Sequence, residues 1–345
     1  MLAAVLYGPG KLEVASYPDP EIAQGEILVK VKAASICGTD LRIIAGKKTR
    51  GVRYPSIIGH EFSGVVAAVG NEVENFKPGD RVAIAPIIPC RNCFYCLSGL
   101  ENICINRKAI GYEFDGGFAE YVRIPAIALA SGNVFQIDSK VSFKEAALLE
   151  QLSCCLNGQR KIGVGLGDTV LVIGAGPIGL MHVMLAKAKG ARKVAVSEPN
   201  EKRRLLALEL GADLVIDPRT ETLNDVSCRE TDMGFDIAIM AIGIPTIVND
   251  VLKVVRKGGK VSLFAGFAEG QTSIIDSNII HYNEIVVTGA SASTRQDFTQ
   301  AMLLSDSYKI NLKQLISHSF TLDNMTAALE VARSAEGLKT IIEFN

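Results

Sequence analysis

Four cysteines within a short segment carry the strongest chemical signal in this sequence. They follow the pattern Cys-x2-Cys-x2-Cys-x7-Cys and are Cys90, Cys93, Cys96 and Cys104. Four thiolates at such spacing can close a tetrahedral zinc site that has no position left for water, so we expect a structural zinc ion. Two alternatives remain: reduced thiols without metal, and an iron–sulfur cluster, although the ferredoxin run Cys-x2-Cys-x2-Cys-x3-Cys-Pro is not matched.

A glycine-rich turn, GAGPIG, follows the apolar run Thr169–Ile173 and opens a helical stretch. Its first glycine permits a tight turn, the second lets the backbone approach a pyrophosphate, and the third lets helix and strand pack closely. The helix N-terminus then offers free N–H groups and a partial positive charge to the phosphates. The residues predicted to hold the dinucleotide here are Gly174, Gly176, Pro177, Ile178 and Gly179.

A second short apolar run, Lys193–Val196, ends just before Glu198. A carboxylate about 20 residues after the glycine motif accepts hydrogen bonds from the ribose hydroxyls and repels a 2′-phosphate. This favours NAD over NADP. The adjacent Arg203 and Arg204 keep NADP open, since a nearby arginine can accept the 2′-phosphate. A structural turn followed by a surface glutamate is the non-functional alternative.

Composition narrows the class of protein. The 345 residues suggest two domains, and 36 basic residues nearly cancel 37 acidic ones, so we expect no nucleic-acid or membrane partner. The N-terminus has no basic region followed by a long apolar run and predicts no signal peptide. The apolar stretch Val170–Ala188 is interrupted early by glycines and Pro177, which favours a buried strand, turn and helix over a membrane span. The expected location is cytoplasmic.

The pattern of apolar runs and turn residues changes near residue 153. Before it, short β-like runs alternate with glycine and proline, which predicts a barrel-like or partly open β architecture. After it, apolar strands alternate with helical segments, which predicts a parallel sheet covered by helices on both faces. The expected strands are Glu26–Ala33, Gly64–Val69, Asp80–Ile84, Thr169–Ile173, Lys193–Val196, Leu214–Ile216, Phe235–Met240, Lys260–Phe264 and Ile285–Thr288. The expected helices include 174–189, Asn200–Leu210 and Val248–Val255, and Thr340–Phe344 is expected to be extended.

The whole chain resembles the medium-chain zinc-dependent alcohol and polyol dehydrogenases. The matching segments keep the family's order and spacing: CGTD at 37–40, GHEFSG at 59–64, KPGDRV at 77–82, the four-cysteine lobe, DGGFAEYV at 115–122, ALLEQLSCCLNG at 147–158 and GAGPIG at 174–179. The segment around Glu150 is similar to sorbitol dehydrogenase and its bacterial polyol and sugar-acid relatives, whereas family alcohol dehydrogenases often have cysteine there.

The resemblance implies an α/β protein: a Rossmann-type doubly wound parallel sheet plus a mostly-β GroES-like catalytic domain. The implied domains are 1–152 with a structural zinc lobe at 88–106, an NAD-binding domain at 153–289, and a return segment at 290–345 that completes the catalytic domain. The family forms dimers or tetramers through the cofactor domain, so we expect a homodimer or homotetramer, with Ile285–Thr288 as a candidate edge strand.

The resemblance also implies a catalytic zinc held by Cys37, His60 and Glu150, with Glu61 beside it as a direct or exchanging ligand. Taken singly, these residues have plainer interpretations, as a small core residue, a satisfied histidine and surface carboxylates. A zinc ion lowers the pKa of an alcohol, and hydride then passes to the nicotinamide. Thr39 matches the family's hydroxyl that begins proton removal, with a local turn hydrogen bond as the alternative.

Several positions depart from the family pattern. Arg42 stands where alcohol dehydrogenases often have the histidine that completes the proton relay, and an arginine does not act as an ordinary base. Water then completes the relay, or Arg42 binds substrate or cofactor. The basic residues that follow either form a solvated loop or indicate an anionic substrate; they are Lys47, Lys48, Arg50 and Arg53. Sorbitol dehydrogenases have an arginine shortly after the position of Gly289, but this chain has Ala290-Ser291-Ala292-Ser293.

The predicted function is therefore oxidation of a secondary alcohol of a polyol, sugar phosphate or sugar acid, with two zinc ions and NAD. Arg203 and the pair Gly266-Phe267 match cofactor contacts of the polyol dehydrogenases. One alternative is a threonine-dehydrogenase-like activity on an amino alcohol, against which Glu150 argues because an aspartate-containing segment is expected there. Another is a non-catalytic structural or redox-sensing relative.

Overall fold

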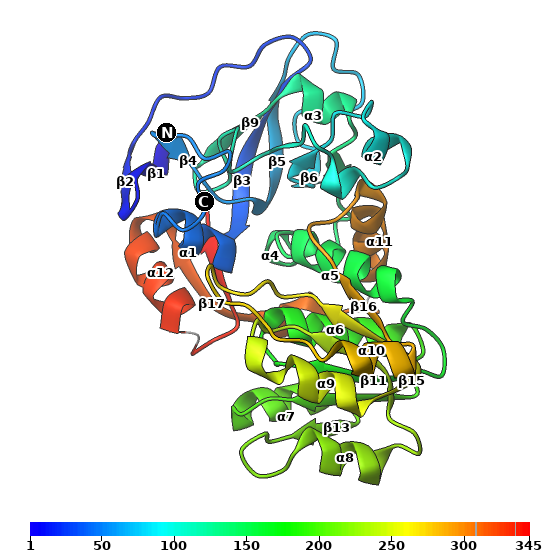
Figure 1. The fold of residues 1–345 in the computed structure, drawn as a ribbon. Coiled ribbons are helices and arrows are strands. Elements are labelled where there is room, and N and C mark those ends of the chain that lie inside the picture. Colours follow the sequence, from blue (N-terminus) through cyan, green and yellow to red (C-terminus); the bar gives the residue numbers. More distant parts are fainter. Residues whose placement is uncertain (308, 335) are drawn as a thin grey trace. The chain divides into compact units, whose positions relative to one another are not determined.

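The chain forms two compact units, according to a computed structural model that describes residues 1–307, 309–334 and 336–345. Unit 1 comprises Met1–Ser153 and Ala292–Asn345, and unit 2 comprises Cys154–Ser291. Unit 2 is therefore one continuous insertion, and the last residues return to unit 1 (Figure 1). Among the helices of the described ranges, none has both the length and the apolar character needed to cross a membrane.

Unit 1 is built on an antiparallel sheet with the strand order β10-β6-β5-β3-β18-β17, where β17 and β18 are the one parallel pair and β9 also pairs with β3. Along β3 the side chains of Ile27, Val29 and Val31 are fully buried and the intervening ones are not, as a period of two requires. The strands of this sheet are β3 (Ile27–Ser35), β5 (Glu61–Val69), β6 (Arg81–Ile84), β9 (Tyr121–Ile124), β10 (Val134–Gln136), β17 (Ile316–Thr321) and β18 (Lys339–Glu343).

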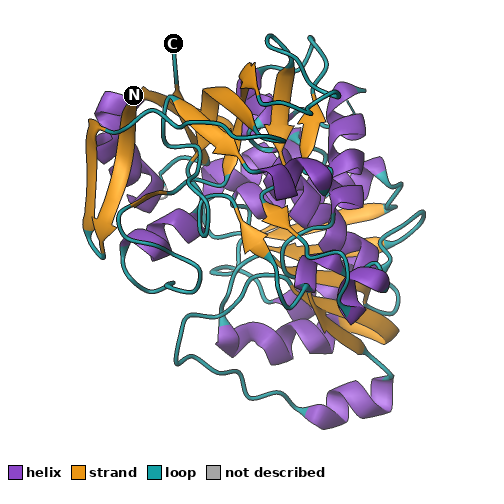
Figure 2. Ribbon diagram, turned by 90° about the horizontal axis from the view of Figure 1, so that it is seen from above, coloured by secondary structure: helices purple, strands orange, loops and turns teal. Residues whose placement is uncertain are grey.

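Smaller elements surround this sheet. A second sheet has the order β2-β1-β4, and its β1–β2 hairpin lies beside the N-terminus (Figure 2). The remaining strands of unit 1 are β1 (Leu2–Gly8), β2 (Lys11–Ser16), β4 (Ser56–Ile57), β7 (Ile87–Ile88) and β8 (Lys108–Ala109). Its helices are α1 (Gly38–Ile44), α2 (Phe94–Leu97), α3 (Ala126–Ala130), α4 (Phe143–Ala146), α11 (Arg295–Asp306) and α12 (Met325–Ser334), while α5 (Leu149–Ile162) runs on into unit 2.

Unit 2 is a parallel sheet with the strand order β13-β12-β11-β14-β15-β16. This is the order of a doubly wound dinucleotide-binding fold, in which the strand order reverses between the first and fourth strands, here β11 and β14. The strands are β11 (Thr169–Ile173), β12 (Lys193–Ser197), β13 (Leu214–Ile216), β14 (Phe235–Met240), β15 (Val255–Leu263) and β16 (Val286–Gly289). The helices are α6 (Pro177–Ala188), α7 (Glu201–Glu209), α8 (Leu223–Glu230), α9 (Val248–Val254) and α10 (Ser277–Asn283).

The predicted fold class is confirmed, and most predicted elements differ from the structure by one to three residues at their ends. The largest difference concerns β15, which starts at Val255 instead of Lys260, directly after the helix expected over Val248–Val255 ends at Val254. Residues 254–255 form a continuous apolar pair that serves both elements, and Gly258 and Gly259 lie inside the strand, where glycine is usually a poor strand former.

Candidate metal and cofactor sites

A thiol, an imidazole and a carboxylate converge in unit 1. Donor atoms of Cys37, His60 and Glu61 all lie within 4.8 Å of one another. Sheet register explains the convergence: β3 and β5 are antiparallel, and Ser35 at the end of β3 pairs with Glu61 at the start of β5. Cys37 follows β3 as the N-cap of α1, and His60 directly precedes β5, so both flank the same end of the strand pair.

Asp40 contacts both His60 and Cys37 through its carboxylate. Its Oδ1 lies 3.1 Å from His60 Nδ1, and its Oδ2 accepts a 2.9 Å hydrogen bond from the Cys37 backbone N–H. A carboxylate on Nδ1 orients the ring and leaves Nε2 for a metal, as in many zinc sites. Burial lowers the pKa of His60, but the charges of Asp40, Tyr112 and Cys37 and the hydrogen bond to Asp40 together outweigh it, and the pKa lies well above the ordinary value. Binding of a metal at Nε2 releases that proton.

Glu61 is fully buried and forms an ion pair with Lys339, whose Nζ lies 2.7 Å from Glu61 Oε2. Burial raises the pKa of Glu61, yet the charges of Lys339 and His60 outweigh burial and hold the pKa below its usual range. The other oxygen, Oε1, is buried and has no hydrogen-bond partner among the described residues. An unpaired carboxylate oxygen beside a thiol and an imidazole is a donor set that fits zinc.

The remaining predicted catalytic residues lie around this group. Arg42 Nη2 donates to Thr39 Oγ1 at 3.0 Å. Glu150 is not one of the three clustered donors, and Gln151 Nε2 instead lies 3.8 Å from the Cys37 sulfur. Burial raises the pKa of Tyr112, the charge of His60 opposes the rise, and Glu150 adds to it, so Glu150 lies within electrostatic range.

The four-cysteine segment has the spacing of a metal site. Its sulfurs lie within 4.8 Å of one another, with Cys93–Cys96 at 3.5 Å, Cys93–Cys104 at 3.8 Å and Cys90–Cys96 at 4.0 Å. A tetrahedral site with zinc–sulfur bonds of about 2.3 Å separates its sulfurs by about 3.8 Å. A hydrogen bond from the Cys96 backbone N–H lowers the pKa of Cys93 to about 6, which favours the thiolate that a metal requires.

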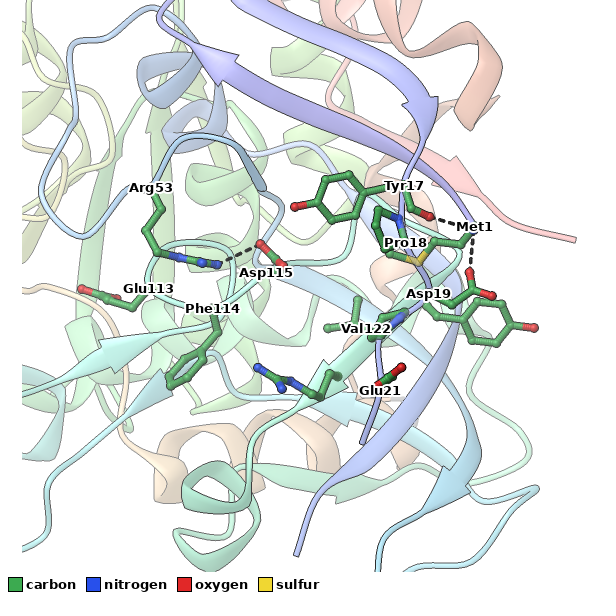
Figure 3. A pocket seen from close by; sticks show the side chains of 13 residues that line it. Met1, Tyr17, Pro18, Asp19, Glu21, Arg53, Glu113, Phe114, Asp115 and Val122 are labelled. Carbon is green, nitrogen blue, oxygen red and sulfur yellow. Dashed lines mark hydrogen bonds and ion pairs between the residues drawn. The ribbon is translucent and has the colours of Figure 1, made fainter. Parts of the chain in front are cut away.

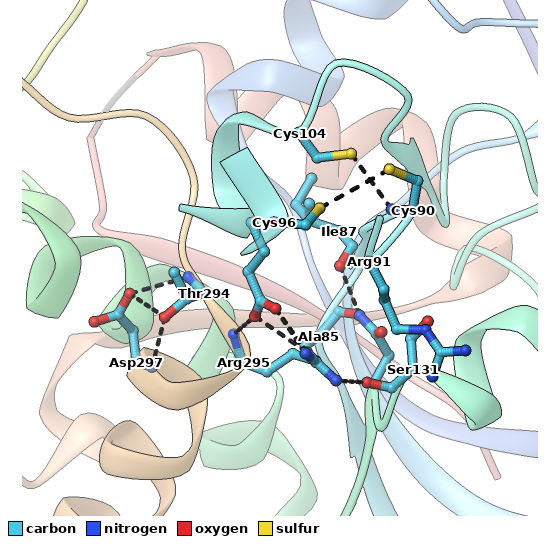
Figure 4. A network of polar contacts seen from close by, with 12 residues as sticks. Ala85, Ile87, Cys90, Arg91, Cys96, Cys104, Ser131, Thr294, Arg295 and Asp297 are labelled. Atoms are coloured by element: carbon cyan, nitrogen blue, oxygen red, sulfur yellow. Dashed lines mark hydrogen bonds and ion pairs between the residues drawn. The ribbon is translucent and has the colours of Figure 1, made fainter. Parts of the chain in front are cut away.

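The cysteine lobe is fastened to the start of α11 (Figure 4). Arg295 Nη2 lies 2.7 Å from Glu101 Oε2, its backbone N–H donates to Glu101 Oε1 at 2.6 Å, and its Nη1 donates to the Ser131 carbonyl. Thr294 and Asp297 close the helix N-terminus as a capping box. Arg295, which belongs to the returning segment, therefore holds the cysteine lobe in place. It lies 194 positions after its partner Glu101 in the sequence.

In unit 2 the glycine motif has the geometry of a phosphate loop. Gly174 has φ +93°, which favours glycine, and a Cβ on Gly179 would lie 1.8 Å from the Gly174 carbonyl oxygen. By contrast, a Cβ on Gly176 would meet nothing within 4 Å. Gly176 is the N-cap of α6 and Pro177 its first residue, so the helix N-terminus opens onto free space that a pyrophosphate fits.

Glu198 follows β12 beside this loop. Its two carboxylate oxygens accept backbone hydrogen bonds from Ala175 at 2.8 Å and Asn200 at 2.9 Å, which fix it against the turn while lone pairs remain for ribose hydroxyls. Arg204 donates to the Glu198 carbonyl at 2.8 Å and pairs with Asp217 at 3.1 Å. Arg204 is therefore engaged by protein oxygens, although it shares the Asp217 carboxylate with Arg219.

Three further predicted cofactor residues belong to the same unit. Arg203 lies in the first turn of α7, where its backbone N–H donates to the Asn200 cap. Gly266 and Phe267 follow β15, at the carboxyl edge of the parallel sheet where dinucleotides bind. Phe267 packs against the core of unit 2. Ile178 is the second residue of α6.

The basic segment 47–53 is divided between two environments. Arg53 Nη2 pairs with Asp115 at 2.9 Å on the wall of a cavity of about 420 Å³ near the N-terminus (Figure 3). Lys48 instead donates to the Tyr112 hydroxyl at 3.3 Å. The cavity contains none of the cysteine or histidine donors described above. The charge of Arg53 is thus neutralised by Asp115, at a place away from the metal-binding group. Lys48 contacts a neutral hydroxyl, so its charge is not neutralised in this way.

Sequence reasoning missed three residues of the site. Asp40 was part of the CGTD segment without a role, although an acid three residues after a helix N-cap indicates a capping box. Tyr112 packs on the His60 ring with centroids 5.6 Å apart. Lys339 is separated from Glu61 by 278 positions, and no local pattern marks a lysine in an apolar run as an ion-pair partner.

Comparison with known proteins agrees with this geometry. The family "Alcohol dehydrogenase GroES-like domain" matches residues 23–133, and "Zinc-binding dehydrogenase" matches residues 177–307. The chain is 36% identical to an L-threonine 3-dehydrogenase of Pyrococcus furiosus, over 95% of this chain and 94% of that one.

Solved structures show the same similarity. A zinc-binding dehydrogenase from Sinorhizobium meliloti, bound to NADP, superposes with a TM-score of 0.93 at 31% identity, covering 99% of each chain. Galactitol-1-phosphate dehydrogenase from Escherichia coli gives a TM-score of 0.90 at 28% identity, covering 100% of each chain. Sequence motifs, donor geometry and full-length similarity agree, and the chain belongs to the medium-chain zinc-dependent alcohol and polyol dehydrogenase family.

Proposed function

We propose that this protein oxidises a secondary alcohol of a polyol, sugar phosphate or sugar acid and transfers the hydride to NAD. The observation that carries the proposal is the convergence of Cys37, His60 and Glu61, in which Glu61 Oε1 has no partner among the described residues. A zinc ion held there supplies a Lewis acid that lowers the pKa of the alcohol hydroxyl. Glu150 is proposed as a further ligand or as a carboxylate in the surrounding shell.

The protein's own groups then have distinct tasks. Asp40 holds the His60 ring in the orientation that leaves Nε2 available. Thr39, whose hydroxyl can accept and donate at once, takes the proton from the alcohol. Arg42 is bonded to that hydroxyl and cannot receive the proton, so the proton passes from Thr39 to water. Glu61 stays charged through its pair with Lys339.

NAD is the proposed acceptor. The open space at Gly176 and the N-terminus of α6 support pyrophosphate binding, and Glu198 supports recognition of the ribose hydroxyls. The pairing of Arg204 with Asp217 argues against a 2′-phosphate site at that arginine. The four thiols Cys90, Cys93, Cys96 and Cys104 are proposed to hold the structural zinc ion.

L-Threonine is the second candidate substrate, because the curated relative at 36% identity is an L-threonine 3-dehydrogenase. Threonine also carries a secondary hydroxyl, so the same metal-binding group and proton acceptor would serve. Oligomerisation is proposed through β16, which lies at the edge of the parallel sheet with Val286 52% exposed.

The deciding experiment is NADH formation by the zinc-loaded protein with four substrate sets: neutral polyols, polyol phosphates, sugar acids and L-threonine. Turnover of polyol-derived alcohols with a kcat/KM well above that for L-threonine supports the leading proposal, and the reverse order supports the second. No NAD reduction with any set, by protein that retains both zinc ions, would instead support a non-catalytic relative.

A further inference from the structure

Lys48 lies one aromatic ring away from the metal-binding group. Its Nζ is 3.3 Å from the Tyr112 hydroxyl and 4.8 Å from the centre of the Tyr112 ring. The same ring lies 5.6 Å, centre to centre, from the ring of His60. The lysine is half-buried, so its ammonium has lost part of its hydration. Besides its contacts with Tyr112, a partly dehydrated ammonium is stabilised by an anion, either a permanent one or one brought by a ligand.

No permanent carboxylate partner is present within the part of the chain that the structure describes. Ion pairs within 4.0 Å include Arg53 with Asp115 but none for Lys48, Arg42 or Arg107. The hydrogen bonds of Arg42 and Arg107 go to neutral oxygens, namely Thr39 Oγ1 at 3.0 Å and the Asn102 carbonyl at 2.8 Å. Within the described ranges, Lys48, Arg42 and Arg107 therefore lack a carboxylate partner of the kind that Asp115 provides for Arg53.

These cations act on one another. Burial lowers the pKa of Lys48, and the charges of Arg42 and Arg107 lower it further, with Cys37 and Asp40 opposing more weakly. The electrostatic environment of the ammonium is therefore dominated by like charge, although the thiol and carboxylate of the metal-binding end are also within range. An oxyanion placed among the three cations would relieve this repulsion.

We propose that Lys48, Arg42 and Arg107 bind an oxyanion of the alcohol substrate, a phosphate monoester or a carboxylate, while its hydroxyl lies at the Cys37–His60–Glu61 group. The assignment rests on the function proposed above and narrows its substrate class. A phosphate dianion matches three cations better than a single carboxylate does, and the guanidinium groups present the paired donors that oxyanions prefer. The carboxylate of an amino acid would also be attracted here, whereas its ammonium would be repelled.

The first test measures binding of inorganic phosphate by calorimetry at low ionic strength, without turnover. Lys48→Met removes the charge and keeps the aliphatic length, Lys48→Arg restores a cation, and Lys47→Met removes the same formal charge from the exposed neighbour. Loss of a charge-assisted contact is expected to weaken binding about tenfold to a hundredfold in Lys48→Met, with recovery in Lys48→Arg. Equal phosphate affinities for Lys48→Met and Lys47→Met would overturn the assignment.

The second test compares kcat/KM for a hexitol, its 1-phosphate and the corresponding hexonate. The wild-type protein is expected to prefer one oxyanion substrate, and the ratio of oxyanion to neutral kcat/KM should fall at least about tenfold in Lys48→Met, mainly through KM. Which of the two substrates is preferred identifies phosphate or carboxylate. Equal kcat/KM for all three substrates removes the anion site but leaves the dehydrogenase function standing. Phosphate binding that depends on Lys48, without oxidation of any alcohol, supports the anion site and contradicts the dehydrogenase function.

Discussion

Arg42 Nη2 donates a 3.0 Å hydrogen bond to Thr39 Oγ1, so a permanent cation contacts the hydroxyl that begins the proposed proton transfer. Because a guanidinium donates only, it fills one acceptor position of that hydroxyl and leaves the O–H free to donate. It also favours negative charge on Thr39 as the proton leaves. In the proposed mechanism, Arg42 therefore stabilises negative charge on Thr39 instead of accepting its proton.

We expect Thr39→Ala to lower kcat about 100-fold or more with a smaller change in KM, because a positioned proton acceptor contributes about 10² to 10⁴ to rate. Thr39→Ser, which keeps the hydroxyl, should retain most activity. Steady-state kinetics with the preferred alcohol and NAD measure both. Comparable kcat values for the alanine and serine variants would show that the hydroxyl has only a structural role.

Removal of Lys339 should destabilise unit 1. Glu61 is fully buried and Lys339 is 2% exposed, so Lys339→Met leaves an uncompensated buried carboxylate at a cost of about 3–5 kcal/mol. Lys339→Arg keeps the charge and should cost less. Denaturant unfolding at neutral pH measures the difference, with zinc content recorded for each protein. A loss below about 1 kcal/mol for the methionine variant would contradict the expectation.

The two proposed zinc ions should be separable by mutation. Cys96→Ser is expected to remove the ion of the cysteine lobe, lower the zinc content from two ions to one, and lower the Tm because a structural metal contributes directly to folding. Cys228→Ser is the matched control, since Cys228 is exposed and lies outside both donor groups. Metal analysis that finds the same zinc content in both variants would place no ion at the lobe.

His182 should make unit 2 sensitive to acid. It is fully buried and accepts from Gln159 Nε2 at 3.3 Å, and burial lowers its pKa from 6.5 to about 3. Because the folded-state pKa is below the unfolded value, the stabilisation is complete above about pH 6.5 and is lost as the pH falls toward 3, by about 1.4 kcal/mol per unit.

This prediction is tested by unfolding free energies between pH 7 and pH 4. His182→Asn, which keeps an acceptor for Gln159, should show a shallower decline than wild type, whereas His281→Gln at an exposed position should not. Parallel pH profiles for wild type and His182→Asn would mean that His182 is not the titrating group.

Glu198 should set the choice between NAD and NADP. Glu198→Gln removes the charge that repels a 2′-phosphate and weakens recognition of the ribose hydroxyls, so the ratio of kcat/KM for NAD over NADP should fall about tenfold to a hundredfold. Glu201→Gln, at an exposed position on α7, is the control and should leave the ratio unchanged. An unaltered ratio in Glu198→Gln would move cofactor selection to another residue.

The parallel sheet of unit 2 was readable from sequence because buried parallel strands are continuous apolar runs. β11, β13 and β14 begin and end at the predicted residues. The first half of β15 was not predicted, because it contains Lys257, Gly258 and Gly259, a pattern typical of a loop. Local pattern therefore located strands wherever burial was uniform along them.

The site was readable only in part. The cysteine lobe and the glycine motif are local patterns, and their spacing alone indicated their chemistry. The group of Cys37, His60 and Glu61 depends on the antiparallel register of β3 and β5, which no local spacing encodes. Asp40 has a local capping signal, but its contact with His60 depends, like the positions of Tyr112 and Lys339, on packing between separate segments. The sequence indicated Arg42 and the basic segment 47–53 but not Arg107, and the pairing of Arg53 with Asp115 depends on contact between distant segments.

Strand β18 has one more consequence, for the order in which the protein matures. It lies beside β3 with Ile341 opposite Ser35, and it carries Lys339, whose ammonium also caps the Ile36 carbonyl at 2.9 Å. A ribosome-bound chain can thus complete unit 2, a contiguous insert, while unit 1 still lacks a central strand. Synthesis reaches Lys339, the countercharge of Glu61, only after all of unit 2, so the buried ion pair beside the metal-binding group should form after the insert is complete.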